Sequence, residues 1–575
     1  MITGIISTMK QFGINGRYIK YIFIGAVVIL TLFRIYLGVN IPLFLQGDAR
    51  YDDYLMVQYA DSISSGNWLG NYCNITLVKT CSMSLMLVLG HFCGISYSMM
   101  LTVLYILSVL AISVSFGKLS DNRYIGIICY IVLLFSPIMF HKENVQKVYR
   151  GGYIVIFSMF VTAAVVGLFA FCKEKISRMV IWSIIGSLAL PIFWYMKEDS
   201  IWLLPFVVTG IAITIICLAL DKKTQNKSLR IVICTLPLVS LILCILIYRG
   251  INKKYYDIYT DNDRSNTYFA EVIHDLLKME NAGDEDSWLT RESLVNALSS
   301  SEAFASIGWE VLSVYDMRAG KDGNVVGDYF IWGLRESAGV AGIYDNGAKE
   351  SEGYWKTIHD ELTKAYEEGK LTEDDNAIFL SPVTRGAALE EISNYYRNNL
   401  RNTLKQILIY EFNDLELLES VGDADRISIM AVYAGNNYIS ETNYDEVAIQ
   451  RYEKVVGIAN NMIDIFERSA RIVLKVSVIG YIAFILTGII YRRQGVIRLD
   501  DIRLLTVCLG LGLTSLILIM AVLWFCNFLT DYKIYDYCSA AIPMIQILEI
   551  IGIYYFIRTI YMYIKNVSLK RCKKA

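Results

Sequence analysis

Ten apolar stretches, each long enough to cross a bilayer, constrain this chain more than any other feature. A spanning helix needs roughly 20 apolar residues, and a 575-residue chain in which 55% of residues are apolar and 19% are charged is typical of a membrane protein. The apolar piece 80–93 is too short to cross, and we predict a re-entrant or interfacial helix there. We therefore expect a mainly α, polytopic integral membrane protein with about 10 transmembrane helices. The predicted spans are 18–40, 98–116, 124–140, 153–171, 179–196, 201–220, 231–249, 472–491, 504–528 and 539–562.

An acidic, water-soluble block interrupts this membrane sequence. Residues 251–470 hold 20 Lys and Arg against 40 Asp and Glu, whereas the rest of the chain holds 33 basic and 15 acidic residues. The block contains no cysteine, and its apolar residues recur with helical spacing. We expect three parts: a membrane domain at 1–250 with about seven helices, an inserted helical domain at 251–470, and a membrane domain at 471–575 with about three helices.

The basic residues of the short loops predict the orientation. Cytoplasmic loops carry an excess of Lys and Arg, and a ten-span arrangement puts nearly every basic cluster on one side. Both termini are then expected in the cytoplasm, and 251–470 outside a plasma membrane. The first long loop, 41–97, also faces outside. We expect membrane lipids as partners and no nucleic acid. The basic clusters on the cytoplasmic side are 10–20, 118–123, 173–178, 222–230, 492–503 and 570–574.

In this orientation, seven charged residues without an obvious structural role are expected on the external side. The two acids that open the segment "YDDYLMVQYADSISSG" are interpreted either as helix-start acids favoured by the helix dipole or as a general base at the membrane surface. The basic residues are either headgroup-facing side chains or ligands for an anionic headgroup. The residues concerned are Asp48, Asp52, Asp53, Lys79, Arg150, Lys197 and Glu198.

The acidic block offers no spacing that predicts a metal site. The four histidines of the chain are isolated, so no metal ligand is predicted, although a divalent metal stays possible. Four tryptophans of the block either stack on sugars or anchor its core. They are Trp288, Trp309, Trp332 and Trp355.

Several stretches resemble bacterial membrane glycosyltransferases of the GT-C superfamily. The segment "YDDYLMVQYADSISSGNWLGNYCNITLVK" (51–79) resembles their first external loop. "VYRGGY" (148–153) resembles their external arginine loop, and "KEDSIWLLP" (197–205) is similar to a signature of uncharacterised bacterial members. Residues 329–371 of the acidic block also resemble the external domain of these relatives.

The resemblance implies an inverting glycosyltransferase that uses a polyprenyl-phosphate-linked sugar. The acceptor is then an external surface glycan, lipid or protein. The resemblance implies that Asp52 is the general base and that Asp53 orients the acceptor or assists a metal. It also implies that Lys79 and Arg150 bind the phosphate. Further donor contacts implied in this way are Lys197, Glu198 and Asp48.

A non-enzymatic multi-pass membrane protein is the alternative. It would be a transporter, or a receptor whose acidic domain binds an external ligand. The sequence shows no inverted repeat and no pair of helices broken by Gly or Pro, which weighs against the transporter.

Overall fold

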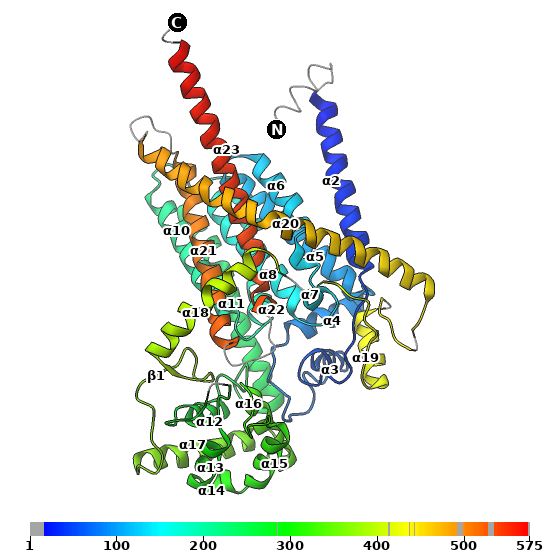
Figure 1. Cartoon of the computed structure of the whole chain (residues 1–575), viewed down its shortest axis with the longest axis vertical. Coiled ribbons are helices and arrows are strands. Elements are labelled where there is room, and N and C mark those ends of the chain that lie inside the picture. The colour runs from blue at the N-terminus through cyan, green and yellow to red at the C-terminus, as the bar shows by residue number, and fades with distance from the viewer. Residues whose placement is uncertain are drawn as a thin grey trace.

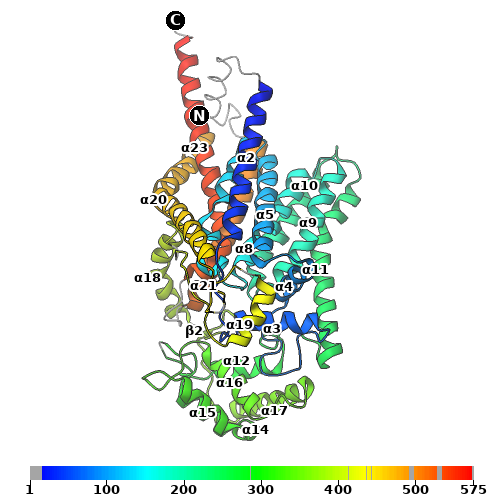
Figure 2. The same ribbon diagram turned by 90° about the vertical axis from the view of Figure 1, so that its right-hand side faces the viewer.

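The computed structural model is an elongated, mainly helical molecule (Figure 1). It describes residues 16–284, 286–411, 414–435, 437–441, 443–490, 498–526 and 534–572. Helix accounts for 72% of the structure and strand for 3%, so the predicted mainly α class is confirmed. The apolar helices form a bundle, and α12–α17 of the acidic block lie at one end of it, opposite the C-terminal part of α23 (Figures 1 and 2).

The part before the acidic block contains long apolar helices separated by short helices of the loops. In chain order its elements are α2 (Gly16–Val39), α3 (Asp53–Ser64), α4 (Ser82–Cys93), α5 (Tyr97–Leu119), α6 (Arg123–Leu134), the 3-10 turn η1 (Pro137–Met139), α7 (Lys142–Val145), α8 (Gly151–Phe171), α9 (Ile176–Trp194), η2 (Ser200–Leu203), α10 (Leu204–Leu220) and α11 (Lys227–Tyr256).

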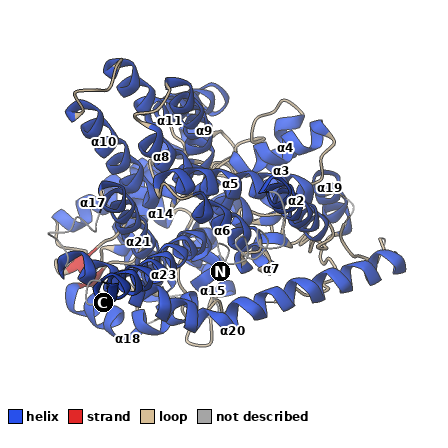
Figure 3. Ribbon diagram, turned by 90° about the horizontal axis from the view of Figure 1, so that it is seen from above, coloured by secondary structure: helices blue, strands red, loops and turns tan. Residues whose placement is uncertain are grey.

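The acidic block and the C-terminal part complete the chain. Their elements are α12 (Tyr268–Leu277), α13 (Arg291–Ser300), α14 (Glu302–Ala305), α15 (Gly308–Arg318), α16 (Tyr329–Val340), α17 (Ala348–Glu367), β1 (Ala377–Ile378), β2 (Ala387–Ala388), α18 (Leu389–Leu408), α19 (Ala424–Ala434), α20 (Glu446–Ile490), α21 (Leu499–Cys526), α22 (Ile534–Cys538), η4 (Ser539–Ala541) and α23 (Ile542–Cys572). The two short strands pair antiparallel, with Ala377 opposite Ala388 (Figure 3).

Among the residues that the structure describes, eight helices are long and apolar enough to cross a membrane. They coincide with eight of the ten predicted spans. The predicted spans 18–40 and 124–140 coincide with shorter apolar helices, Ile24–Val39 and Arg123–Met139, and α4 is a third short one. The helices are thus compatible with a multi-pass membrane protein.

The predicted span 124–140 differs from the structure because its helix is broken. Helix α6 ends at Leu134, and a 3-10 turn begins at Pro137, a residue that lacks an N–H and disfavours helix at the position before it. Arg34 of α2 compensates for the break. Its buried guanidinium donates to the carbonyls of Leu134 and Met139, at 3.1 Å each. A charged residue in an apolar helix thus satisfies backbone carbonyls at the break.

Small residues allow α20 and α23 to cross closely. A side chain added to Gly480 would collide with the backbone of Gly552, and one added to Gly552 would collide with Ser477. Close approach at small residues is the usual way in which apolar helices associate in lipid. Helix α20 also runs without a break across position 470, so the limit of the acidic block in sequence lies inside one helix.

The acidic block is divided between two environments. Helices α12–α17 surround a second core that includes the buried Trp288 and Trp355 and is joined by Trp524 of α21. Helices α18 and α19 instead pack against the apolar bundle, where Ile407 and Met430 are buried. The compact part of the inserted domain is therefore α12–α17.

Candidate functional site

The first long loop, 41–97, is held in place by the inserted domain. Arg335 of α16 is buried, and its Nε donates to the carbonyl of Asn74 at 2.6 Å. The same guanidinium pairs with Asp263 Oδ2 at 3.2 Å, and the backbone N–H of Asp263 donates to the carbonyl of Leu77 at 2.9 Å. These contacts fix the backbone immediately before Lys79.

Four separate segments bring five side chains together at this place. Lys79 Nζ donates to Asp52 Oδ1 at 2.7 Å and to the Tyr149 hydroxyl at 2.8 Å. The Tyr149 hydroxyl lies 2.9 Å from the same Asp52 oxygen and accepts from Arg150 Nη2 at 2.7 Å. Arg150 Nη1 lies 2.8 and 2.7 Å from the two oxygens of Glu198. We call these five residues the Asp52–Glu198 cluster.

The local folding of each segment explains the convergence. Asp52 directly precedes α3, Lys79 precedes α4, and Arg150 directly precedes α8. Glu198 lies between α9 and the turn η2, and accepts from the backbone N–H of Thr80 at 3.1 Å. The cluster therefore gathers at helix ends on one side of the bundle, where loops rather than helix faces supply the side chains.

The members of the cluster differ in exposure, and this decides what each one can do. The Asp52 side chain is 55% exposed, whereas that of Lys79 is 9% exposed and that of Arg150 is 5% exposed. Arg150 is therefore enclosed against Glu198, and Asp52 offers a carboxylate to a molecule from outside. Two cations face two carboxylates, so the charges of the cluster balance.

Burial and neighbouring charges set the pKa values of the cluster. Desolvation by the surrounding protein would raise the pKa of Asp52, but the charge and hydrogen bond of Lys79, with smaller contributions from Tyr149 and Arg150, outweigh it and hold the pKa below its usual value. Burial would also raise the pKa of Glu198, but Arg150 and Lys79 lower the pKa to about 2. Burial, reinforced by the charge of Arg150, lowers the pKa of Lys79. Both carboxylates are thus ionised at neutral pH.

Aromatic and charged residues of the inserted domain form one wall of the cluster. The Trp332 ring of α16 lies 5.6 Å from Lys79 Nζ and 5.2 Å from the ring of Tyr51. Arg264 lies over the same indole, 4.7 Å from its centroid, and pairs with Asp328 at 3.5 Å. The wall thus combines aromatic rings with a second ion pair.

Asp53 is adjacent to Asp52 in sequence but does not join the cluster. It is 3% exposed, and its Oδ2 has no hydrogen-bond partner among the described residues. Burial raises the pKa of Asp53 to about 7, and the neighbouring charges that act on it include Lys147 and Glu143. The predicted role of Asp53 in orienting an acceptor is therefore at odds with its burial.

Two further predicted residues have other partners. Lys197 Nζ pairs with Asp199 at 2.8 Å and lies 4.5 Å from the centroid of the Tyr537 ring. Asp48 is 74% exposed and lies 3.7 Å from a guanidinium nitrogen of Arg426, beside α19. Both lie on loops, where side-chain partners depend on how distant segments pack. The structure thus brings together Asp52, Lys79, Arg150 and Glu198 of the seven predicted residues.

The buried Asp53 predicts a pH dependence of stability. An Asp whose pKa is about 7 when folded and 3.8 when unfolded keeps its proton longer in the folded state, so stability falls as pH rises between about 4 and 7. The roughly three-unit difference corresponds to at most about 4 kcal/mol. Asp53→Asn should therefore match the wild type in thermal stability at pH 4 and exceed it at pH 8. A difference between the two proteins that is equal at both pH values would contradict this assignment.

Sequence reasoning missed several residues of the site. Tyr149, which bridges Lys79 to Arg150, lies within the segment "VYRGGY" but carries no charge that would mark it. Trp332 is one of four tryptophans of the acidic block, and nothing in its spacing distinguishes it from Trp288 and Trp355, which are buried in the core of α12–α17. Only the packing of α16 against the first loop identifies it.

Comparison with known proteins adds nothing to the geometry of the Asp52–Glu198 cluster. No family model, no characterised protein and no solved structure matches this chain. In the part of the chain that the structure describes, no three His, Cys, Asp or Glu side chains converge as ligands for a metal ion.

Proposed function

We propose that the protein is a membrane glycosyltransferase that transfers a sugar from a polyprenyl-phosphate-linked donor to an acceptor hydroxyl outside the cell. The observation that carries the proposal is the pairing of an exposed carboxylate, Asp52, with a buried cation, Lys79, at 2.7 Å. Inverting sugar transfer needs this combination: a base for the acceptor and a positive charge for the leaving phosphate.

The reaction assigns a role to each member of the pair. The acceptor oxygen attacks the anomeric carbon, and the bond between that carbon and the phosphate oxygen breaks. The bonding electrons leave with the phosphate, whose added negative charge Lys79 stabilises. The acceptor proton passes to Asp52. A donor phosphate that takes over the contact with Lys79 removes this cation from Asp52 Oδ1, so donor binding raises the basicity of Asp52.

Arg150 and Glu198 act on the reaction through their neighbours. Arg150 is buried and bound to both oxygens of Glu198, so it holds Tyr149 and, through it, Lys79 in position. Tyr51 is half-buried, lies beside the pair against the buried Trp332, and offers a ring on which a sugar stacks. This differs from the sequence-based expectation that Arg150 itself contacts the phosphate.

The orientation of the chain supports a lipid-linked donor. The cluster lies between the apolar bundle and α12–α17, which the loop charges put outside. Nucleotide sugars are made in the cytoplasm, so an external site requires a sugar already carried across on a lipid. We therefore assign the protein to the plasma membrane, with 251–470 outside and both termini inside.

The test is a transfer assay with the purified full-length protein in detergent. A panel of synthetic polyprenyl-phosphate sugars is incubated with the protein, and the polyprenyl phosphate released as the sugar passes to water or to an added alcohol is measured. We expect release from at least one lipid-linked donor and none from the matching nucleotide sugars. Turnover of nucleotide sugars, or a panel that neither binds nor reacts, would count against the proposal and favour a transporter or receptor.

A further inference from the structure

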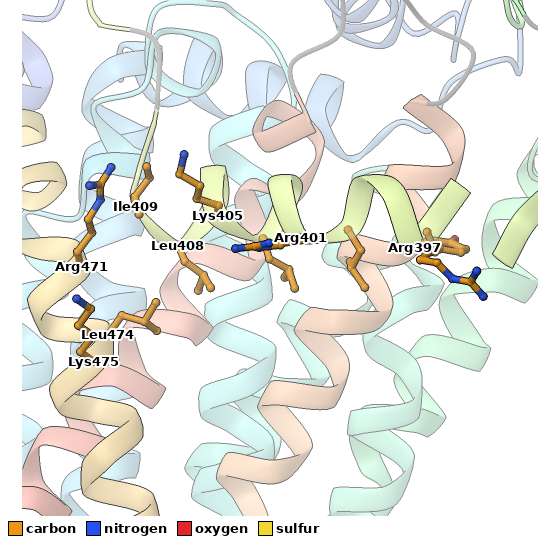
Figure 4. Close-up of a pocket in the computed structure, with 11 residues that line it drawn as sticks. Arg397, Arg401, Lys405, Leu408, Ile409, Arg471, Leu474 and Lys475 are labelled. Atoms are coloured by element: carbon orange, nitrogen blue, oxygen red, sulfur yellow. The ribbon is translucent and has the colours of Figure 1, made fainter. Parts of the chain in front are cut away.

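A second feature lies away from the Asp52–Glu198 cluster, in a groove between α18 and α20 (Figure 4). The groove has a volume of about 650 Å³, which falls within the range of about 300–1,000 Å³ that small-molecule sites occupy. Its lining combines apolar side chains with basic ones and contains no acidic residue. The lining residues are Tyr396, Arg397, Leu400, Arg401, Leu404, Lys405, Leu408, Ile409, Arg471, Leu474 and Lys475.

The sequence of α18 explains this combination. Side chains four residues apart lie on one face of a helix. Arg397, Arg401 and Lys405 follow this spacing and form a basic stripe. The leucines at 400, 404 and 408 follow the same spacing and form an apolar stripe beside it.

Helix α20 completes the groove from the other side. Arg471 and Lys475 are one turn apart, and Leu474 lies between them. Figure 4 shows Arg471 and Lys405 extending toward the same side of α18, while Leu408 extends the opposite way. The groove thus presents both basic and apolar groups.

The cations of the groove are unpaired. Within the described residues, none of the five forms an ion pair or a side-chain hydrogen bond, and all five side chains are exposed. This contrasts with the composition of the surrounding block, where acidic residues outnumber basic ones two to one. An acidic domain that leaves a basic stripe without acidic partners presents a site for a negatively charged ligand.

The groove lies at the edge of the apolar bundle. The hydroxyls of Tyr395 and Tyr396 donate to the carbonyls of Leu523 and Met520, near the end of α21. On α20, Lys475 is followed by the uncharged run 476–490. Helix α18 therefore crosses the apolar helices where their apolar surface ends, as an amphipathic interfacial helix does.

We propose that this groove binds an anionic phospholipid of the surrounding bilayer. The lipid phosphate lies against the basic residues of α18 and α20, and the upper part of an acyl chain covers the leucines. Arginine binds a phosphate through two parallel N–H groups, which suits the three arginines of the groove. The inference concerns membrane attachment of α18 and does not depend on the proposed glycosyl transfer.

The test measures lipid binding to the full-length protein by native mass spectrometry. Phosphatidylglycerol and phosphatidylcholine are titrated separately, and we expect tighter binding of phosphatidylglycerol. Each basic residue near an anionic lipid surface strengthens binding about fivefold. The triple variant Arg397→Gln, Arg401→Gln, Lys405→Gln should therefore bind phosphatidylglycerol at least about tenfold more weakly, with unchanged binding of phosphatidylcholine.

A matched control removes the same charge elsewhere in the acidic block. The variant Lys321→Gln, Lys364→Gln, Lys370→Gln changes three exposed lysines outside the groove and should bind phosphatidylglycerol like the wild type. If the groove triple variant is poorly folded, the single variant Arg401→Gln should still weaken binding severalfold.

Two results would overturn the inference. The first is an equal loss of phosphatidylglycerol binding in the groove and control variants. This result would mean that binding depends on the net charge of the protein and not on the groove. The second is competition by glycerol 3-phosphate. If this soluble headgroup displaces the lipid at comparable concentration, the groove binds a free phosphate and the leucines contribute nothing. Leu404→Gln separates the lipid from a free phosphate independently, because it should weaken binding of phosphatidylglycerol but not of glycerol 3-phosphate.

Discussion

Replacing Asp52 with asparagine is expected to slow sugar transfer by about 10²–10⁴-fold. The amide keeps the shape of the side chain but cannot accept the acceptor proton as the new bond forms. Donor binding should be unchanged or tighter, because Lys79 loses the carboxylate that competes with the phosphate. Transfer rate and donor affinity in detergent check both parts of this expectation.

Lys79→Ala should fail in a different way. Lys79 faces a phosphate that is anionic before the reaction and gains charge as the bond breaks, so the variant should bind donor more weakly and transfer more slowly. Lys79→Arg should restore activity only in part, because a planar fork replaces a point charge within a buried contact. Equal loss of donor affinity in the Asp52 and Lys79 variants would mean that the pair has a common structural role.

A carboxylate on the same helix provides the control. Asp61 of α3 is exposed and lies 3.2 Å from the Tyr433 hydroxyl, away from the cluster. Asp61→Asn should transfer sugar within about twofold of the wild type, since surface substitutions outside such features have small effects. Full activity in Asp52→Asn would remove this residue as the base.

The convergence of Asp52, Lys79, Arg150 and Glu198 was predictable from the sequence, because loops on one side of a helical bundle meet at one face. The charge pattern assigned these loops to one face, and the helix ends do lie together. The partners within that face were not predictable. Asp48 pairs with α19, a helix nearly 400 positions later, and such pairing depends on tertiary packing alone.

The apolar helices likewise have some features that follow from the local sequence and others that do not. Apolar length predicted eight helices well, and Pro137 is a visible reason for the end of α6. The continuity of α20 was not predictable from charge, because a helix of 45 residues passes from an acidic segment to an apolar one without a break signal. The composition of a segment predicts whether water or an apolar environment surrounds it, whereas backbone propensity decides where a helix ends.

Arg335→Met is expected to destabilise the junction between the inserted domain and the first loop by about 3–5 kcal/mol. Arg335 is buried, and its loss leaves the buried carboxylate of Asp263 and the carbonyl of Asn74 without a donor. Because this junction fixes the backbone before Lys79, donor binding should weaken as well. Thermal unfolding and donor affinity of the purified variant measure the two effects.

An exposed pair of the same chemistry shows whether burial is the cause. Arg291 forms two contacts with Asp316, at 2.6 and 3.0 Å, but both side chains are nearly half exposed. Arg291→Met should cost much less stability than Arg335→Met, since exposed ion pairs contribute little. Adding Asp263→Asn to Arg335→Met should recover part of the stability, because the uncompensated buried charge is removed. Similar losses for the two arginine variants, or no recovery in the double variant, would show that Arg335 does not act through this buried pair.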